Sequence, residues 1–355
     1  MNIKPLKIGE LASRLPIIQG GMGVGVSLSN LASAVTKAGG IGIISSAQIG
    51  FKERDFENNP LEANLRALKK HIKLAKEKCN NGIIGVNIMV ATNEYARYVR
   101  TAIESGIDLI ISGAGMPTTL PKLTKGYNVK LAPIVSSLKA AKVILKLWDK
   151  HDNIAPDMIV VEGPKAGGHL GFKKEDIEIS NETFDDTIKA IVSHVKDYEI
   201  KYNKPIPIIA AGGIFNGNDI VKYLNLGASG VQMATRFVAT EECDASKEFK
   251  ESYINATNEN IGIVKSPVGM PGRAILNSFV NKTLNENIKV TKCYNCLTPC
   301  NPSTTPYCIS KALINSVNGD LENGLIFCGE NVSKIKNITT VKKLMTELEN
   351  EIKAI

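Results

Sequence analysis

The chain has 355 residues, enough for one large α/β barrel with an appendage or for two ordinary domains. Its net charge of +8 comes from 43 basic and 35 acidic residues, but the charges form no long run of one sign, which argues against a nucleic-acid partner. No segment reaches the ~18 consecutive apolar residues of a membrane helix, and the N-terminus lacks the apolar stretch of a signal peptide. We therefore expect a cytoplasmic globular protein with neither a membrane nor a nucleic-acid partner.

Eight short segments rich in β-branched residues are almost continuously apolar, as strands buried on both faces should be. They are Ile17–Gln19, Ile41–Ser45, Ile83–Asn87, Leu109–Ser112, Lys130–Ile134, Met158–Val161, Ile206–Ala211 and Gly230–Met233. Segments with helical periodicity lie between them: Leu28–Ala38, Leu61–Lys78, Tyr95–Ser105, Leu138–Asp149, Thr183–Lys201 and Asn218–Leu226. Eight alternating units predict an α/β fold, a (β/α)8 TIM barrel. A doubly wound open sheet is the alternative, but glycines following five of the strands, on one shared rim, favour the barrel.

The pattern changes after residue 240. Residues 245–290 are polar with helical character, and Val341–Ile355 predicts a charged helix. We expect two parts: a barrel over residues 1–240, and a mainly helical C-terminal lobe over residues 241–355 that packs on it.

Two glycine-containing or small-residue loops follow the seventh and eighth predicted strands. The first strand runs into Gly212–Gly213, and the second ends at Ala234–Thr235. Barrels commonly bind phosphate at these loops, where bare backbone N–H groups can approach a dianion. The alternative is that these are ordinary turn residues that end two strands.

One histidine stands out among the four in the chain. His169 follows Gly167–Gly168 just beyond the sixth strand, where an imidazole can lie over a planar ligand and exchange protons near neutral pH. His71, His151 and His194 fall in or near polar helices, and we interpret them as structural or surface residues. Glu162, at the end of the sixth strand, could orient His169 or a cofactor, or simply end the strand.

Seven stretches in chain order resemble the nitronate monooxygenase family, formerly called 2-nitropropane dioxygenases, which shares its fold with the flavin-dependent enoyl-acyl carrier protein reductase II. They are Pro16–Met22, Ala38–Gly42, Gly85–Asn87, Ser112–Gly115, Ala166–His169, Ala210–Gly213 and Gln232–Phe237. The resemblance implies an FMN-dependent oxidoreductase with His169 as the catalytic residue. It implies that the FMN-binding residues are Gly21, Met22, Gly23, Asn87, Gly167, Gly168, Ala211, Gly212, Gly213, Gln232, Met233, Ala234 and Thr235.

Two departures from the family pattern affect this site. Ala234 replaces the usual glycine before the threonine, which still allows an N–H to face phosphate if its φ is negative. Gly23–Gly25 lacks the tryptophan that often follows Gly-Gly-Met, so the fit of the substrate above the flavin is open.

Two reactions fit the resemblance. In the first, which we favour, a small nitronate or nitroalkane is oxidised over the flavin, with His169 as an acid/base or as a group that stabilises the anion. In the second, NAD(P)H reduces FMN, which then reduces an enoyl thioester. The segment Gly324–Glu330 is similar to the C-terminal segment of the monooxygenases that returns towards the active site. The sequence is also compatible with a homodimer.

The C-terminal part also holds a compact group of cysteines. Cys293, Cys296, Cys300 and Cys308 lie within sixteen residues, a density that predicts an iron–sulfur cluster or a structural zinc ion. The alternative is four thiols without a metal. The family pattern does not include these cysteines.

Two further classes of function remain open from the sequence. One is a phosphate-binding barrel without redox chemistry, a lyase or an isomerase that uses the same rim. The other is a flavin redox sensor without turnover, suggested only by the cysteines.

Overall fold

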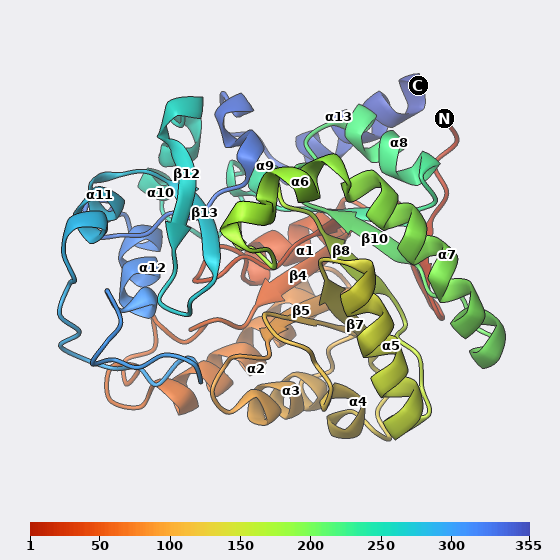
Figure 1. Ribbon diagram of the computed structural model, residues 1–355, viewed down its shortest axis with the longest axis horizontal. Coiled ribbons are helices and arrows are strands. Elements are labelled where there is room, and N and C mark those ends of the chain that lie inside the picture. The colour runs from red at the N-terminus through yellow and green to blue at the C-terminus, as the bar shows by residue number, and fades with distance from the viewer.

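The computed structural model describes residues 1–355 and contains a closed barrel of eight parallel strands (Figure 1). The strands are β3 (Ile17–Gln19), β4 (Ile41–Ser45), β5 (Ile84–Met89), β6 (Leu109–Gly113), β7 (Lys130–Val135), β8 (Ile159–Glu162), β10 (Ile208–Ala211) and β11 (Gly230–Met233). Pairing of β8 with β10 and of β11 with β3 closes the ring. The predicted (β/α)8 barrel is therefore confirmed, and the open doubly wound sheet is excluded.

The barrel is filled by side chains from alternate strand positions. Ile18, Ile43, Leu109 and Val160 are fully buried in one inner cluster. A short N-terminal hairpin, β1 (Leu6–Ile8) and β2 (Leu11–Ser13), adds Leu6 and Ile8 to the same cluster. The hairpin therefore packs on the inner core, and was not foreseen from the sequence.

Helices surround the barrel, and their apolar faces join the strands in the main hydrophobic core. They are α1 (Ser29–Lys37), α2 (Pro60–Lys78), α3 (Tyr95–Glu104), α4 (Leu120–Leu123), α5 (Leu138–Asp152), α7 (Phe184–Tyr202), α8 (Gly217–Asn225) and α9 (Thr235–Val238). A short helix α6 (Ile177–Glu182) between β9 and α7 buries none of its residues. Local capping fixes where α8 begins, because Asn216 and Asp219 form a reciprocal capping box there. None of the helices is both long and apolar enough to span a membrane.

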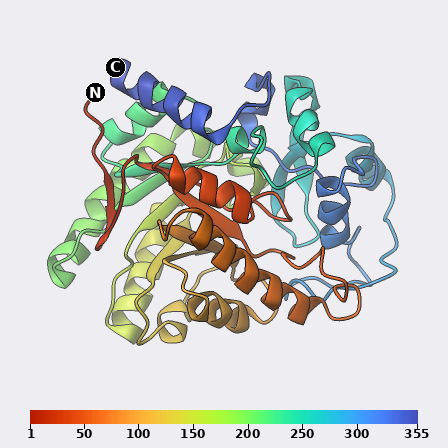
Figure 2. The ribbon, with the colours of Figure 1, turned by 180° about the vertical axis from the view of Figure 1, so that it is seen from behind.

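The C-terminal part contains helices and one antiparallel hairpin. Its helices are α10 (Lys247–Ile254), α11 (Ser278–Asn285), α12 (Ile309–Val317) and α13 (Val341–Ala354), and its strands are β12 (Ile261–Lys265) and β13 (Pro271–Ile275). The expectation that residues 245–290 are helical is therefore wrong for residues 261–275, which form this hairpin. Figures 1 and 2 show α13 returning to the barrel, where it packs on α8 and α1.

Candidate active site

A cavity of about 470 Å³ lies at the carboxyl ends of the barrel strands, between the barrel and the C-terminal part. Loops that follow β3, β4, β5, β8, β10 and β11 form most of its wall. Residues 113–116 and 134–136, at the ends of β6 and β7, also line it, and the C-terminal part contributes Phe249, Tyr253, Met270 and residues between Cys296 and Asn331. In barrels of this type the carboxyl ends of the strands carry the functional groups, so this cavity is the candidate active site.

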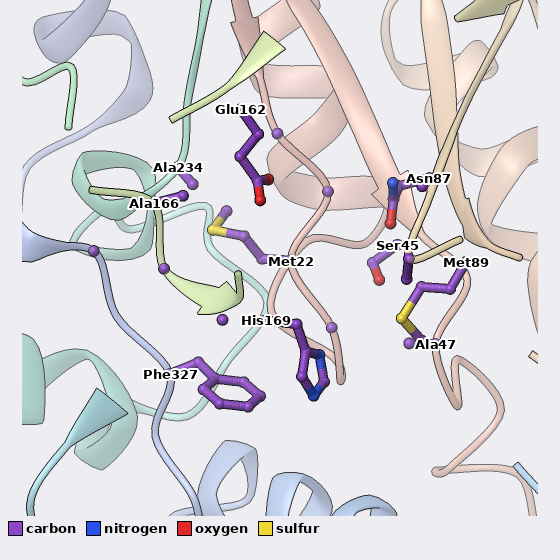
Figure 3. Close-up of a pocket in the computed structure, with 18 of the residues that line it drawn as sticks. Met22, Ser45, Ala47, Asn87, Met89, Glu162, Ala166, His169, Ala234 and Phe327 are labelled. Carbon is purple, nitrogen blue, oxygen red and sulfur yellow. The ribbon is translucent and has the colours of Figure 1, made fainter. Parts of the chain in front are cut away.

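Every residue that the family resemblance implied for the cofactor lines this one cavity, and so does His169. The thirteen cofactor positions are Gly21, Met22, Gly23, Asn87, Gly167, Gly168, Ala211, Gly212, Gly213, Gln232, Met233, Ala234 and Thr235. Figure 3 shows how several side chains converge: Met22 lies towards Glu162, with Asn87 and Ser45 across the pocket. The sequence-predicted residues are thus brought together, although their contacts with a ligand stay predictions.

The loops after β10 and β11 present unpaired backbone donors. The N–H groups of Gly212, Gly213 and Ala234 donate to no acceptor in the protein. Gly212 and Gly213 adopt φ values of +94° and +80°, which favour glycine, and a Cβ on Gly212 would lie 2.8 Å from the Gly163 carbonyl oxygen. Ala234 has a φ of −130°, so its side chain causes no backbone strain. Unpaired N–H groups of this kind suit a phosphate.

A buried acceptor in the same cavity also lacks a partner. The side-chain oxygen Oε1 of Gln232 is shielded from solvent and accepts no hydrogen bond from the protein. An orphaned buried acceptor is costly unless a ligand donates to it. Gly21, in the loop after β3, lies against β5, because a Cβ there would clash with the Asn87 side chain. The unpaired donors at one end and this acceptor in the cavity fit FMN, which carries a phosphate and a ring N–H.

His169 is held by contacts with the C-terminal part. It lies in the two-residue strand β9 (Gly168–His169), which pairs with β13 so that His169 is opposite Gly272. Its Nε2 is 2.6 Å from the hydroxyl oxygen of Ser266, and its ring lies edge-on to Phe327 at 5.1 Å (Figure 3). Burial lowers the pKa of His169 to about 4, so the ring is neutral at pH 7.

Glu162 ends β8 and points its carboxyl group into the cavity (Figure 3). Burial raises its pKa to about 7, and no neighbouring cation offsets this effect. It makes no hydrogen bond with His169, whose protein partner is Ser266. The possibility that Glu162 orients His169 is therefore not supported, and a role towards the cofactor stays open.

The segment Phe327–Asn331 closes the cavity above the cofactor loops. The Gly329 N–H donates to the Thr235 hydroxyl at 3.2 Å, and the Asn331 side chain donates to the Gly213 carbonyl at 2.6 Å. Residues 324–330 therefore return towards the site, as their resemblance to the C-terminal segment of the monooxygenases led us to expect.

Arg273 of β13 binds the backbone of the loop that precedes His169. Its Nη1 donates to the carbonyl oxygens of Pro164 at 2.6 Å and Ala166 at 2.8 Å, while Nη2 lies 3.3 Å from Glu330. Ser266, Arg273 and Phe327 are residues of this site that the sequence analysis missed. The polar Ser-Pro-Val-Gly stretch signals a turn, but nothing in the chain indicates that the strand after it pairs with β9.

The predicted iron–sulfur or zinc site is not supported. Among Cys293, Cys296, Cys300 and Cys308, no three side chains converge, alone or with nearby His, Asp or Glu, into a group that could hold a metal ion. Cys293 is exposed at the surface, whereas Cys296 faces the cavity. Burial raises the pKa of Cys296, Cys300 and Cys308, which favours thiols over the thiolates that metals require. Close spacing along the chain does not aim these sulfur atoms at a common point.

Known proteins resemble this chain over most of its length. The profile of the nitronate monooxygenase family matches residues 4–351. A probable nitronate monooxygenase of Staphylococcus saprophyticus is 27% identical over 309 residues, which is 81% of this chain and 82% of the relative.

Solved structures share the fold as well. FabK from Thermotoga maritima has a TM-score of 0.74 and 27% identity, covering 96% of this chain and 94% of its own. Nitroalkane oxidase from Streptomyces ansochromogenes has a TM-score of 0.72 at 18% identity, covering 96% of each chain, and supports the fold alone. With the barrel, the cavity and a match from residue 4 to residue 351, the chain belongs to the nitronate monooxygenase family and is an oxidoreductase.

Proposed function

We propose that this protein is an FMN-dependent oxidoreductase that oxidises small nitronates at the barrel rim, with His169 in contact with the substrate. The observation that carries the proposal is the single cavity that gathers His169, the unpaired N–H groups of Gly212, Gly213 and Ala234, and the unpaired Gln232 acceptor. A non-redox phosphate-binding barrel would not need that acceptor.

The residues of the chain divide the cavity between cofactor and substrate. Gly212, Gly213 and Ala234 would hold the phosphate, and Gln232 Oε1 would accept a hydrogen bond from the flavin ring. When bound, FMN would take electrons from the nitronate and pass them to dioxygen. His169, neutral and fixed by Ser266, would bind and orient the substrate beside that ring. Phe327 would exclude water from one side.

An enoyl thioester reductase that uses NAD(P)H is the second candidate. One observation favours it: the cavity extends along apolar side chains between the end of β5 and the C-terminal part, lined by Met89, Leu297, Ile309, Leu313 and Leu325. That wall suits an acyl chain better than a small nitronate. FabK, an enoyl-acyl carrier protein reductase II, has a solved structure that is 27% identical to this chain.

One set of measurements separates these candidates. The purified protein is mixed anaerobically with NADH, NADPH or a preformed nitronate such as propyl-2-nitronate while the flavin absorbance is followed. Our proposal expects the nitronate to change the flavin spectrum and to drive dioxygen consumption in air. Flavin bleaching by NAD(P)H, with reoxidation by an enoyl thioester and no response to nitronate, would establish the second candidate instead. A protein that reacts with none of these reagents would contradict both.

A further inference from the structure

The β12–β13 hairpin brings one serine hydroxyl onto the His169 ring. Ser266 opens the turn between the two strands, where its N–H donates to Met270 and its carbonyl accepts from Gly269. The Leu170 N–H donates to the Pro271 carbonyl at 2.9 Å, which extends the pairing of β13 with β9 past His169. Ser266 is only 1% exposed, and its backbone hydrogen bonds with Met270 and Gly269 fix its position in the turn.

The proton of this hydroxyl has one acceptor within reach. Ser266 Oγ lies 2.6 Å from His169 Nε2, and it accepts a weak hydrogen bond from the Val268 N–H at 3.5 Å. A buried hydroxyl proton needs an acceptor, and no other hydrogen bond involves this oxygen. The Ser266 O–H therefore donates to Nε2, which must be the unprotonated nitrogen of the ring.

The other ring nitrogen faces the cavity. A neutral imidazole carries one proton, so with Nε2 unprotonated the proton is on Nδ1. Nδ1 makes no hydrogen bond with the protein, although it is not sealed from solvent as an orphaned buried atom would be. The ring itself lines the cavity beside Phe327 (Figure 3). It therefore presents an N–H group, and not a basic lone pair, to the substrate.

We propose that Ser266 is a positioning residue that holds His169 in its Nδ1–H tautomer, so that the site accepts an oxyanion substrate and does not deprotonate a neutral carbon acid. The choice of a nitronate as that oxyanion rests on the proposed function. Nδ1–H donates to a nitronate oxygen, whereas a neutral nitroalkane would first have to lose its α-proton to a base that this tautomer does not supply.

The tautomer is measured directly, without any turnover. Nitrogen-15 NMR of protein labelled at histidine distinguishes protonated from unprotonated ring nitrogens, and a His169→Asn variant identifies the signals of His169 among the four histidines. We expect Nδ1 protonated and Nε2 unprotonated at pH 7 in the native protein and in Ser266→Thr. Ser266→Ala should lose this preference, and Ser252→Ala, which removes a hydroxyl bonded to Phe249 on α10, should keep it. An Nε2–H tautomer in the native protein, or an unchanged tautomer in Ser266→Ala, would overturn the proposal.

Turnover then tests the substrate class. We expect preformed nitronates to be oxidised and the parent nitroalkanes to react at least tenfold more slowly, with kcat/KM for the nitronate falling about tenfold in Ser266→Ala and recovering in Ser266→Thr. Equal turnover of a nitroalkane, with a deuterium isotope effect at its α-carbon, would overturn the donor assignment. If the NMR result holds but no nitronate reacts, the proposed function fails while the role of Ser266 stands.

Discussion

The carboxyl group of Glu162 is an ionisable group of the cavity whose pKa lies close to neutral pH. Burial raises that pKa to about 7, because no cation pairs with the carboxylate at the end of β8. The folded protein therefore keeps this proton to a higher pH than the unfolded chain does. Between the usual carboxyl pKa and about 7, the unfolded chain ionises first, so the free energy of unfolding falls as the pH rises.

Replacing Glu162 with Gln should therefore stabilise the cofactor-free protein above pH 7. We expect Glu162→Gln to raise the free energy of unfolding by about 1–3 kcal/mol at pH 8 and to leave it nearly unchanged at pH 4.5. Urea denaturation at the two pH values measures the difference, with the exposed Glu175→Gln as the matched control. An equal effect at both pH values would show that ionisation is not the cause.

His169 should contribute to turnover but not to cofactor binding. Its ring contacts Ser266 and Phe327, while the unpaired N–H groups belong to Gly212, Gly213 and Ala234. We expect His169→Ala to lower kcat by roughly 10²–10⁴ with flavin still bound, as measured by steady-state kinetics and by the flavin absorbance per chain. Normal turnover in this variant would assign the histidine to packing alone.

At the scale of secondary-structure elements, the β12–β13 hairpin stabilises the loop after β8. Arg273 is 6% exposed, yet its guanidinium bonds two backbone carbonyls of that loop and pairs with Glu330. The planar guanidinium can serve several acceptors at once, which an ammonium or an apolar side chain cannot. One side chain thus joins the hairpin, the loop that bears His169 and the segment that closes the cavity.

Replacing Arg273 should lower the free energy of unfolding. In Arg273→Met, the carbonyls of Pro164 and Ala166 lose their donor, and we expect the free energy of unfolding to fall by about 2–4 kcal/mol. Flavin affinity should fall as well, because the loop includes Gly167 and Gly168. Chemical denaturation and flavin titration measure both quantities. Arg66→Met, which removes exposed ion pairs with Glu53 and Asp55, should change stability by less than about 0.5 kcal/mol.

The elements also show what the sequence could and could not predict. β4 and β11 begin and end at their predicted residues, because strands buried on both faces appear as continuous apolar runs. β12 and β13 were missed: only Val264 of β12 is buried, and β13 buries a charged Arg273, so neither strand shows a clear alternation. The cofactor loops could be located because they follow strand ends. Ser266 could not, because its contact with His169 depends on a strand pairing between distant segments.

At the scale of the whole molecule, the barrel and the C-terminal part build one cavity together. The barrel supplies the unpaired N–H groups of Gly212, Gly213 and Ala234, and residues 327–331 close over them through bonds to Thr235 and Gly213. α13 returns to the barrel surface, where Val341, Leu344 and Ile352 join the main hydrophobic core. The C-terminal residues are therefore part of the site and of the core that supports it.

This closure should select FMN over FAD. The loops after β10 and β11 form one candidate phosphate site, and the segment that bonds Thr235 and Gly213 closes over it. We expect about one FMN and no FAD per purified chain, as identified by mass spectrometry of the released cofactor. Bound FAD, or no flavin after reconstitution, would contradict this assignment.

The late position of Phe327–Asn331 in the chain also sets an order of events during protein synthesis. The last barrel strand ends at Met233, so all eight barrel strands have left the ribosome well before the closing segment emerges. A nascent barrel can thus pair its strands while its cofactor loops still face water. Only the nearly finished chain can close the cavity, because the bonds to Thr235 and Gly213 come from Gly329 and Asn331. Truncated chains that lack these residues should therefore leave the proposed cofactor site open to water.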